Sequence, residues 1–195
     1  MKRPTHRSRL YDKDRFEVCN QRYSALCDES HGAAVLNDCK YGISMNGNEM
    51  QLTLLRAGAS PEMRADNGQH TFTYAFTAWE GDFLSSPVVD EAYDLNVPFV
   101  TEPGNCEQFS AFAPDAKNVY VDTVKLAEDG SGDFILRLYE AKNADTACNL
   151  TVGLPFAKAW ECDMMENKLG EADMKDNTIA LHFHNFEVKT IRLAR

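Results

Sequence analysis

The strongest constraint on the fold of this chain is a period-two alternation of apolar and polar residues. Ile179, Leu181 and Phe183 alternate with His182 and His184. Successive side chains of a β-strand point to opposite faces of its sheet, so this pattern predicts a half-buried strand. The same alternation, less clean in the last segment, predicts further strands at 50–55, 70–77, 119–123, 134–138 and 186–193.

Turn signals separate these segments. Asn46-Gly47 and Asp129-Gly130 are dipeptides that favour tight hairpins, and Asn185 precedes the last apolar segment. Helical spacing of apolar residues is found only at 87–95. Short strands joined by such turns predict an all-β fold, an antiparallel β-sandwich with little helix.

A break in the pattern between residues 97 and 115 indicates a domain boundary. This stretch contains Pro98, Pro103, Gly104 and Pro114 and shows no sustained alternation. Such composition is typical of a linker between compact units. The sequence therefore predicts two β units, residues 1–105 and 106–195, that pack against each other because the second is small for an independent core.

The overall charge argues against some classes of partner. A formal charge of −10 over 195 residues would repel nucleic acid, and the basic residues within 2–9 are interpreted as a solvated tail. No apolar run reaches the about 20 residues that cross a bilayer, and the N-terminus lacks a signal-peptide core. The six cysteines form no CxxC pair, so we expect reduced thiols and a cytoplasmic, membrane-free protein.

Chemistry-bearing motifs are sparse. His182 and His184 form an HxH pair whose rings share one face of the predicted strand, and a third ligand could complete a metal site. No nearby Cys, Asp or His supplies that ligand at a metal-site spacing, so we expect a solvent-facing strand without metal. The GxSxG, P-loop, GxGxxG and HExxH motifs are also missing, and no catalytic residue is predicted.

The hexapeptide NDCKYG at 37–42 has two interpretations of equal weight. Asn37, Asp38 and Gly42 are residues that favour turns, which accounts for a simple connection. Lys40 and Tyr41 are less well explained in this way. Together with Asp38 they offer an acceptor, a cation and a stacking ring, which is the set of groups that binds a polyol such as a sugar.

Collinear sequence blocks carry a family likeness from Arg3 to Leu193. The chain resembles the C-terminal part of the α-mannosidases of glycoside hydrolase family 38, most closely the cytosolic and bacterial branch. Two stretches depart from the family pattern, RSRLYD at 7–12 and ALCDES at 25–30. The blocks are RPTH at 3–6, RFEVC at 15–19, VLNDCKYG at 35–42, LTLLRA at 52–57, ADNGQHTFTYA at 65–75, VDEAYDLNVP at 89–98, DTVKLAEDG at 122–130, LRLYEA at 136–141 and FEVKTIRL at 186–193.

The resemblance implies a large retaining exo-glycosidase with a zinc ion and an aspartate nucleophile in an N-terminal α/β barrel. This chain matches only the last portion, so no cofactor is expected in it and the zinc is expected in the absent barrel. Residues 1–105 would be the end of the large mannosidase β-sandwich and 106–195 the small terminal sandwich. The implied partners are α-mannoside glycans and the N-terminal catalytic domain, and the chain is interpreted as an excised or truncated portion.

The resemblance also implies a place for substrate contacts. In the family, a loop of the large sandwich reaches the sugar pocket, with an arginine near the end of a strand. Arg56 is the matching residue, and we expect it to shape a sugar subsite with Asp38, Lys40 and Tyr41. Two further residues, Asp66 and His70, are expected to hold the intervening loop. The competing interpretation of Arg56 is a structural ion pair at the sandwich edge.

The expected role is therefore that of an accessory region which, alone, neither hydrolyses an aryl α-mannoside nor binds zinc stoichiometrically. The alternative is an autonomous carbohydrate-binding module, which an exposed aromatic platform would favour. Phe72, Tyr74 and Phe76 alternate as core residues do, leaving Trp79 and Trp160 as candidates for such a platform. Self-association through apolar faces left uncovered by the absent barrel is a third, weaker possibility.

Overall fold

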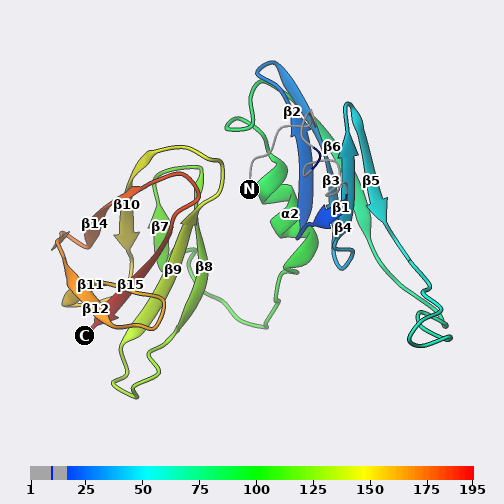
Figure 1. Ribbon diagram of the computed structural model, residues 1–195. Helices are drawn as coiled ribbons and strands as arrows, with labels where there is room; N and C mark the ends of the chain where they lie inside the picture. Colours follow the sequence, from blue (N-terminus) through cyan, green and yellow to red (C-terminus); the bar gives the residue numbers. More distant parts are fainter. Residues whose placement is uncertain (1–9, 11–16) are drawn as a thin grey trace. The chain divides into compact units, whose positions relative to one another are not determined.

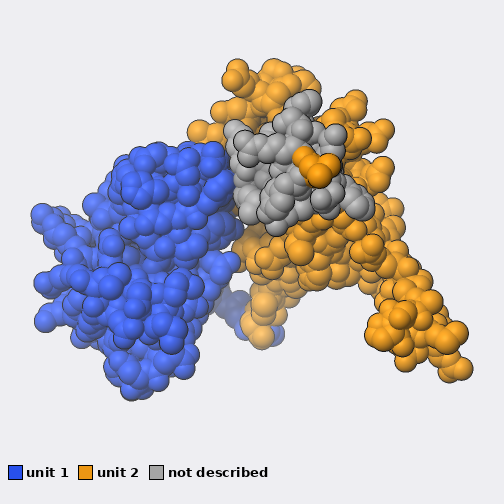
Figure 2. Space-filling view, viewed as in Figure 1, with its two compact units in different colours: residues 1, 103–195 blue, residues 2–102 orange. Residues whose placement is uncertain are grey.

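The computed structural model describes Leu10 and residues 17–195, which divide into two compact units (Figures 1 and 2). Unit 2 contains the described residues up to Glu102, and unit 1 contains Pro103–Arg195. The RPTH block, the RSRLYD stretch apart from Leu10, and the basic residues of 2–9 lie outside the described residues. Each unit is described by itself below.

Over residues 17–102, unit 2 contains two antiparallel three-stranded sheets, with strand orders β1-β4-β5 and β2-β3-β6, and the helix α2. The Asn46-Gly47 dipeptide forms the predicted hairpin between β4 and β5, where Gly47 has a φ of 60°. The elements are β1 (Glu17–Cys19), β2 (Tyr23–Cys27), β3 (His31–Asn37), β4 (Gly42–Asn46), β5 (Glu49–Thr53), β6 (Tyr74–Glu80) and α2 (Val88–Asn96).

Helix α2 covers one side of the β2-β3-β6 sheet (Figure 1). Val88, Val89 and Ala92 are buried on one face of the helix, as the helical spacing at 87–95 predicts. Asp90 and Glu91 lie in the first turn, where negative charge interacts favourably with the helix dipole. Apolar burial along this face therefore fixes which side of the sheet becomes core.

The prediction that Phe72, Tyr74 and Phe76 belong to the core is wrong for β6. Tyr74 and Phe76 are 59% and 70% exposed, whereas Trp79 on the opposite face of the strand is only 9% exposed. The Trp79 indole lies directly over Gly32 of β3, where a Cβ atom would come within 2.1 Å of the ring. Trp79 is thus a core residue, and the expectation that it stands free is also wrong.

Unit 1 is a sandwich of a four-stranded sheet, β13-β14-β10-β7, and a five-stranded sheet, β12-β11-β15-β9-β8. All its strand pairs are antiparallel. The strands are β7 (Phe112–Pro114), β8 (Val119–Leu126), β9 (Phe134–Glu140), β10 (Thr146–Val152), β11 (Lys158–Cys162), β12 (Lys168–Ala172), β13 (Met174–Lys175), β14 (Thr178–Phe183) and β15 (Val188–Ala194).

One hydrophobic core lies between the two sheets of unit 1. Leu136 of β9 and Ile191 of β15 meet Leu150 of β10 and Phe183 of β14, and all four are fully buried. In β14 the buried residues alternate with exposed ones, as the period-two pattern predicts. The all-β, antiparallel fold with little helix is therefore confirmed.

Two further expectations concern the state of the cysteines and membrane-spanning segments. All six cysteines are free, as predicted, with Cys148 and Cys162 buried and the other four exposed. Among the described residues, no helix is both long enough and apolar enough to cross a membrane.

Candidate functional site

The NDCKYG hexapeptide begins with a buried residue, Asn37, that organises the surrounding loops. Its Oδ1 accepts the backbone N–H of Lys40 at 2.8 Å, and its Nδ2 donates to Asn20 Oδ1 at 3.2 Å. Its backbone N–H donates to the carbonyl of Arg22, and its carbonyl accepts Nδ2 of Asn96 at the end of α2. Because Asn37 is 0% exposed, these bonds replace the water that its polar atoms would otherwise require.

Asp38 and Lys40 attach the hexapeptide to the segment that leads into β6. The Asp38 carboxylate accepts the Thr73 N–H at 2.9 Å, and the Asp38 N–H donates to the Thr73 carbonyl. The Cys39 thiol and the Thr73 amide hold the pKa of Asp38 below its ordinary value. Lys40 Nζ lies 4.5 Å from the centre of the Phe72 ring, a cation–π contact. Both side chains are thus engaged within the loop.

Tyr41 and Arg56 lie near the same end of the β1-β4-β5 sheet, before the start of β4 and after the end of β5. Tyr41 is 55% exposed and precedes Gly42, which pairs with Thr53 three residues before Arg56. Arg56 Nη1 makes an ion pair with Glu17 Oε2 at 3.3 Å, while the Arg56 side chain remains 75% exposed. Glu17 also accepts a hydrogen bond from Thr53. This contact is the structural ion pair that competes with a sugar-subsite role as the interpretation of Arg56.

Asp66 and His70 lie in the loop between β5 and β6. The Asp66 carboxylate accepts the Ala57 N–H at 3.0 Å, and both residues adopt positive φ angles. The His70 ring nitrogen Nε2 lies 2.8 Å from the Asp66 carbonyl oxygen. The contacts therefore divide the predicted residues into three groups: Asp38 and Lys40 with 72–73, Arg56 with Glu17, and Asp66 with His70.

A cluster that the sequence did not reveal lies in unit 1. Asp145 Oδ1 lies 2.8 Å from His182 Nε2, and Asp145 Oδ2 lies 3.1 Å from His184 Nδ1. The premise that no Asp stands near the HxH pair is therefore wrong. Asp145 is 37 residues from His182 in sequence, and only the pairing of β10 with β14 brings them together. The hydrogen bond with His184, more than that with His182, lowers the pKa of Asp145.

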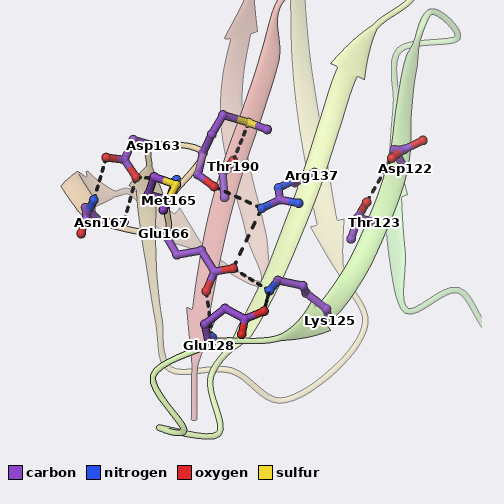
Figure 3. A network of polar contacts seen from close by, with 11 residues as sticks. Asp122, Thr123, Lys125, Glu128, Arg137, Asp163, Met165, Glu166, Asn167 and Thr190 are labelled. Atoms are coloured by element: carbon purple, nitrogen blue, oxygen red, sulfur yellow. Dashed lines mark hydrogen bonds and ion pairs between the residues drawn. The ribbon is translucent and has the colours of Figure 1, made fainter.

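A second polar network in unit 1 centres on the buried residue Glu166 (Figure 3). Its Oε1 makes an ion pair with Lys125 Nζ at 2.7 Å and lies 4.0 Å from Arg137 Nη2, and its Oε2 accepts the Glu128 N–H. These contacts, with the Lys125 hydrogen bond as the largest cause, lower the pKa of Glu166. Glu166 has a φ of 68°, so the network fixes a strained turn as well as a charge.

An open cleft of about 490 Å³ adjoins this network. Its lining consists of Met165 and six charged or polar residues, Glu128, Asp129, Glu166, Asn167, Lys168 and Arg192. Several charged lining residues are paired: Arg192 binds Asp129 within the cleft, and Glu166 binds Lys125, which is not a lining residue. We therefore interpret these paired charged residues as stabilisers of the β8–β9 hairpin and the β11–β12 turn.

Comparison with known proteins identifies the family. The model of the glycosyl hydrolases family 38 C-terminal domain matches residues 1–64, and that of the family 38 C-terminal beta sandwich domain matches residues 118–191. Human alpha-mannosidase 2C1 is 38% identical over 201 residues, which are 99% of this chain and 19% of that protein. The alpha-mannosidase of Saccharomyces cerevisiae is 30% identical over 218 residues, 98% of this chain and 20% of that protein.

Solved structures agree in fold. An alpha-mannosidase from Enterococcus faecalis V583 superimposes with a TM-score of 0.70 at 17% identity, covering 90% of this chain and 21% of that one. The chain thus spans about a fifth of the length of the curated relatives it matches. Two C-terminal domain models of one family match this chain in collinear order, so the chain belongs to glycosyl hydrolase family 38, and it is similar to the C-terminal region of that family's α-mannosidases.

Proposed function

We propose that this chain serves as the accessory C-terminal region of an α-mannosidase that hydrolyses terminal α-mannosides. The observation that carries the proposal is the likeness to human alpha-mannosidase 2C1 along 99% of the chain. Catalysis, and the zinc ion it uses, would reside in an N-terminal barrel to which this region gives structural support. The six free cysteines suit a reducing, cytoplasmic location.

Within that role, Arg56 with Asp38, Lys40 and Tyr41 would contribute to the sugar subsite of the intact enzyme. The exposure of Arg56 and Tyr41 supports this assignment, because both side chains can reach a partner domain. Glu17 would orient the guanidinium, whose several fixed donors suit sugar hydroxyls better than a lysine would. Asp66 and His70 would hold the loop that follows Arg56.

Kinetics of the intact enzyme test this assignment. In an α-mannosidase that contains this region, we expect Arg56→Ala to raise KM for an aryl α-mannoside, and Arg56→Lys to restore it poorly. Arg64→Ala, which removes another exposed arginine of the same loop, is the matched control. If Arg56→Ala leaves the kinetics unchanged but lowers the Tm, and Glu17→Gln lowers the Tm to the same extent, the ion-pair role is supported and the subsite role is rejected.

One observation favours the second candidate, an autonomous carbohydrate-binding module. Tyr74 and Phe76 are exposed on one face of β6, and the Tyr74 ring stacks on Phe72 at 6.4 Å between ring centres. Sugars stack on such flat rings. Calorimetric titration of the chain with mannose and mannobiose separates the two functions: saturable binding that Tyr74→Ala abolishes supports the module, and absence of heat supports the accessory role.

The same aromatic face supports a third, weaker proposal of self-association. Phe76 pairs with Val35 across β3 and β6, so an apolar strip faces solvent in unit 2. Exposed strips of this kind mark contact surfaces. In the intact enzyme the strip would pack against the remainder of the large sandwich instead.

A further inference from the structure

The outer face of the β13-β14-β10-β7 sheet brings together three side chains with metal-binding atoms. His182 lies in β14, His184 immediately follows this strand, and Asp145 lies immediately before β10. One ligand atom from each residue lies within 4.8 Å of the other two. We propose that Asp145, His182 and His184 form a binding site for a divalent transition-metal ion of the Zn²⁺ class, separate from any catalytic zinc. This proposal replaces the expectation from the sequence that the strand holds no metal and that the chain does not bind zinc stoichiometrically.

The fold builds this cluster from strand alternation and register. Ile179, Leu181 and Phe183 fill the core, so the residues between them must face outward. His182 pairs with Ala147 in β10, which places Asp145 beside the end of β14. Strand β13 pairs only with Thr178 and Ile179, so the histidine end of β14 is not covered by its neighbour within the described sheet.

The distances fit a metal with little rearrangement. The carboxylate oxygens lie 2.8 Å and 3.1 Å from the two imidazole nitrogens. In a tetrahedral zinc site with bonds of about 2.0–2.1 Å, neighbouring ligand atoms are about 3.3 Å apart. The two oxygen–nitrogen distances therefore need to lengthen by only about 0.2–0.5 Å, and one ligand atom from each of the three residues already lies within 4.8 Å of the others. With His182 Nε2 and His184 Nδ1 deprotonated, both nitrogens and the carboxylate would bind the ion, and water would fill the remaining position.

The donor set selects the class of ion. Imidazole favours zinc, copper, nickel and iron over the hard cations Ca²⁺ and Mg²⁺, which prefer oxygen ligands. One carboxylate with two neutral imidazoles would give the loaded site a charge of +1. The formal charge of −10 for the whole chain further favours cation binding.

Surrounding contacts hold the two ligand-bearing turns together. Asn185 Nδ2 donates to the Asn143 carbonyl at 2.7 Å, which joins the turn before Asp145 to the turn after His184. The buried Glu140 carboxylate accepts N–H groups from both turns, those of Asn143 and Phe186. Glu187 accepts the His184 N–H at 2.7 Å. Such support keeps ligands in place before the ion arrives and strengthens binding.

Titration of the untagged chain with Co²⁺ and Zn²⁺ tests the proposal. We expect one equivalent of metal to bind, with an optical spectrum for Co²⁺ that lacks thiolate charge-transfer bands, since four exposed cysteines are potential competitors. Zn²⁺ should raise the Tm of unit 1, and a chelator should reverse the rise. No binding, or binding whose spectrum shows thiolate ligation, overturns the proposal.

Single substitutions of the ligands identify the site. Asp145→Asn, His182→Gln and His184→Gln should each weaken metal binding by at least about tenfold. Loss of a residue that only supports a ligand already weakens metal binding by about 10–100-fold, so loss of a ligand itself should cost at least the lower value. The matched control is His31→Gln in unit 2, because His31 lies 3.4 Å from Asp28 in an exposed His–Asp pair without a second histidine. The control should bind metal as the parent chain does. Equal affinity across all four variants would refute the site, even if the chain binds metal elsewhere.

Discussion

Replacing Glu140 by alanine removes the acceptor that joins three parts of unit 1. Glu140 ends β9 and is 1% exposed. Its Oε1 accepts Asn118 Nδ2 at 2.9 Å and the Lys142 N–H at 2.7 Å, and its Oε2 accepts the N–H groups of Asn143 and Phe186, each at 2.9 Å. Burial raises the pKa of this carboxyl, but the hydrogen bonds outweigh it and leave the pKa below its ordinary value.

The expected loss of stability follows from the donors left behind. The bonds from Asn118 and Lys142 are buried, whereas those from Asn143 and Phe186 are partly buried and can be replaced by water. Asn118 Nδ2 keeps its bond to Thr146 Oγ1, so one of its two N–H groups loses its acceptor, as does the Lys142 N–H. A buried N–H group that loses its acceptor costs about 1–3 kcal/mol, so two cost about 2–6 kcal/mol. Removing a buried charge regains part of this, which leaves about 2–4 kcal/mol. Glu140→Gln retains one acceptor oxygen and should lose less.

Urea unfolding measures this loss in unit 1. Trp79 lies in unit 2 and Trp160 in unit 1, so a Trp79→Phe background leaves Trp160 fluorescence as a probe of the unit that contains Glu140. Glu107→Ala, an exposed glutamate of unit 1, is the control and should stay within about 0.5 kcal/mol of its parent. If Glu140→Ala unfolds at the same urea concentration as Glu107→Ala, the carboxylate does not hold the turns together and the reasoning fails.

Two further predictions concern acid stability and a close contact. Hydrogen bonds from Ser131, with help from Arg192, lower the pKa of Asp129 to about 2, so its stabilisation is complete above the unfolded value of 3.8 and is lost as the pH falls toward 2. Asp129→Asn should therefore flatten the fall in unfolding free energy over that range, and an unchanged slope would contradict the assignment. Gly32→Ala should destabilise unit 2 by about 1–3 kcal/mol, because the new Cβ would overlap the Trp79 indole at 2.1 Å. Gly170→Ala, where a Cβ meets open space, should leave the Tm nearly unchanged, and equal melting of the two variants would show that the indole moves aside freely.

Strand alternation was sufficient to predict the sandwich of unit 1 from sequence. Ile179, Leu181 and Phe183 lie in the core as their spacing indicates, and Asp129-Gly130 forms the β8–β9 connection with Gly130 at a φ of 72°. These signals are local: a period of two sets which residues share a face, and a glycine supplies the positive φ that a tight turn requires. No knowledge of distant contacts is needed to interpret them.

Alternation cannot decide which of the two faces of a strand is buried. In β6 the alternation places Tyr74 and Phe76 on one face and Trp79 on the other. Hydrophobicity alone predicts burial of the face with two aromatic residues. The packing of α2 selects the other face, because Gly32 on β3 leaves room for the Trp79 indole. That choice depends on a contact between residues 47 positions apart, and so lies beyond any local pattern.

The hexapeptide NDCKYG shows why site residues are harder to predict than strands. The sequence indicates a turn former at Asn37, yet Asn37 is buried and bonds to Asn20, Arg22, Lys40 and Asn96. Three of these four partners become neighbours only after β3 has paired and α2 has docked. An amide offers both donors and an acceptor, so one buried side chain can satisfy several chain segments at once. Because the buried Asn37 holds the loop together, substitutions at the exposed Tyr41 can change the surface chemistry of the loop without disturbing its structure, as the proposed substrate-contacting role would require.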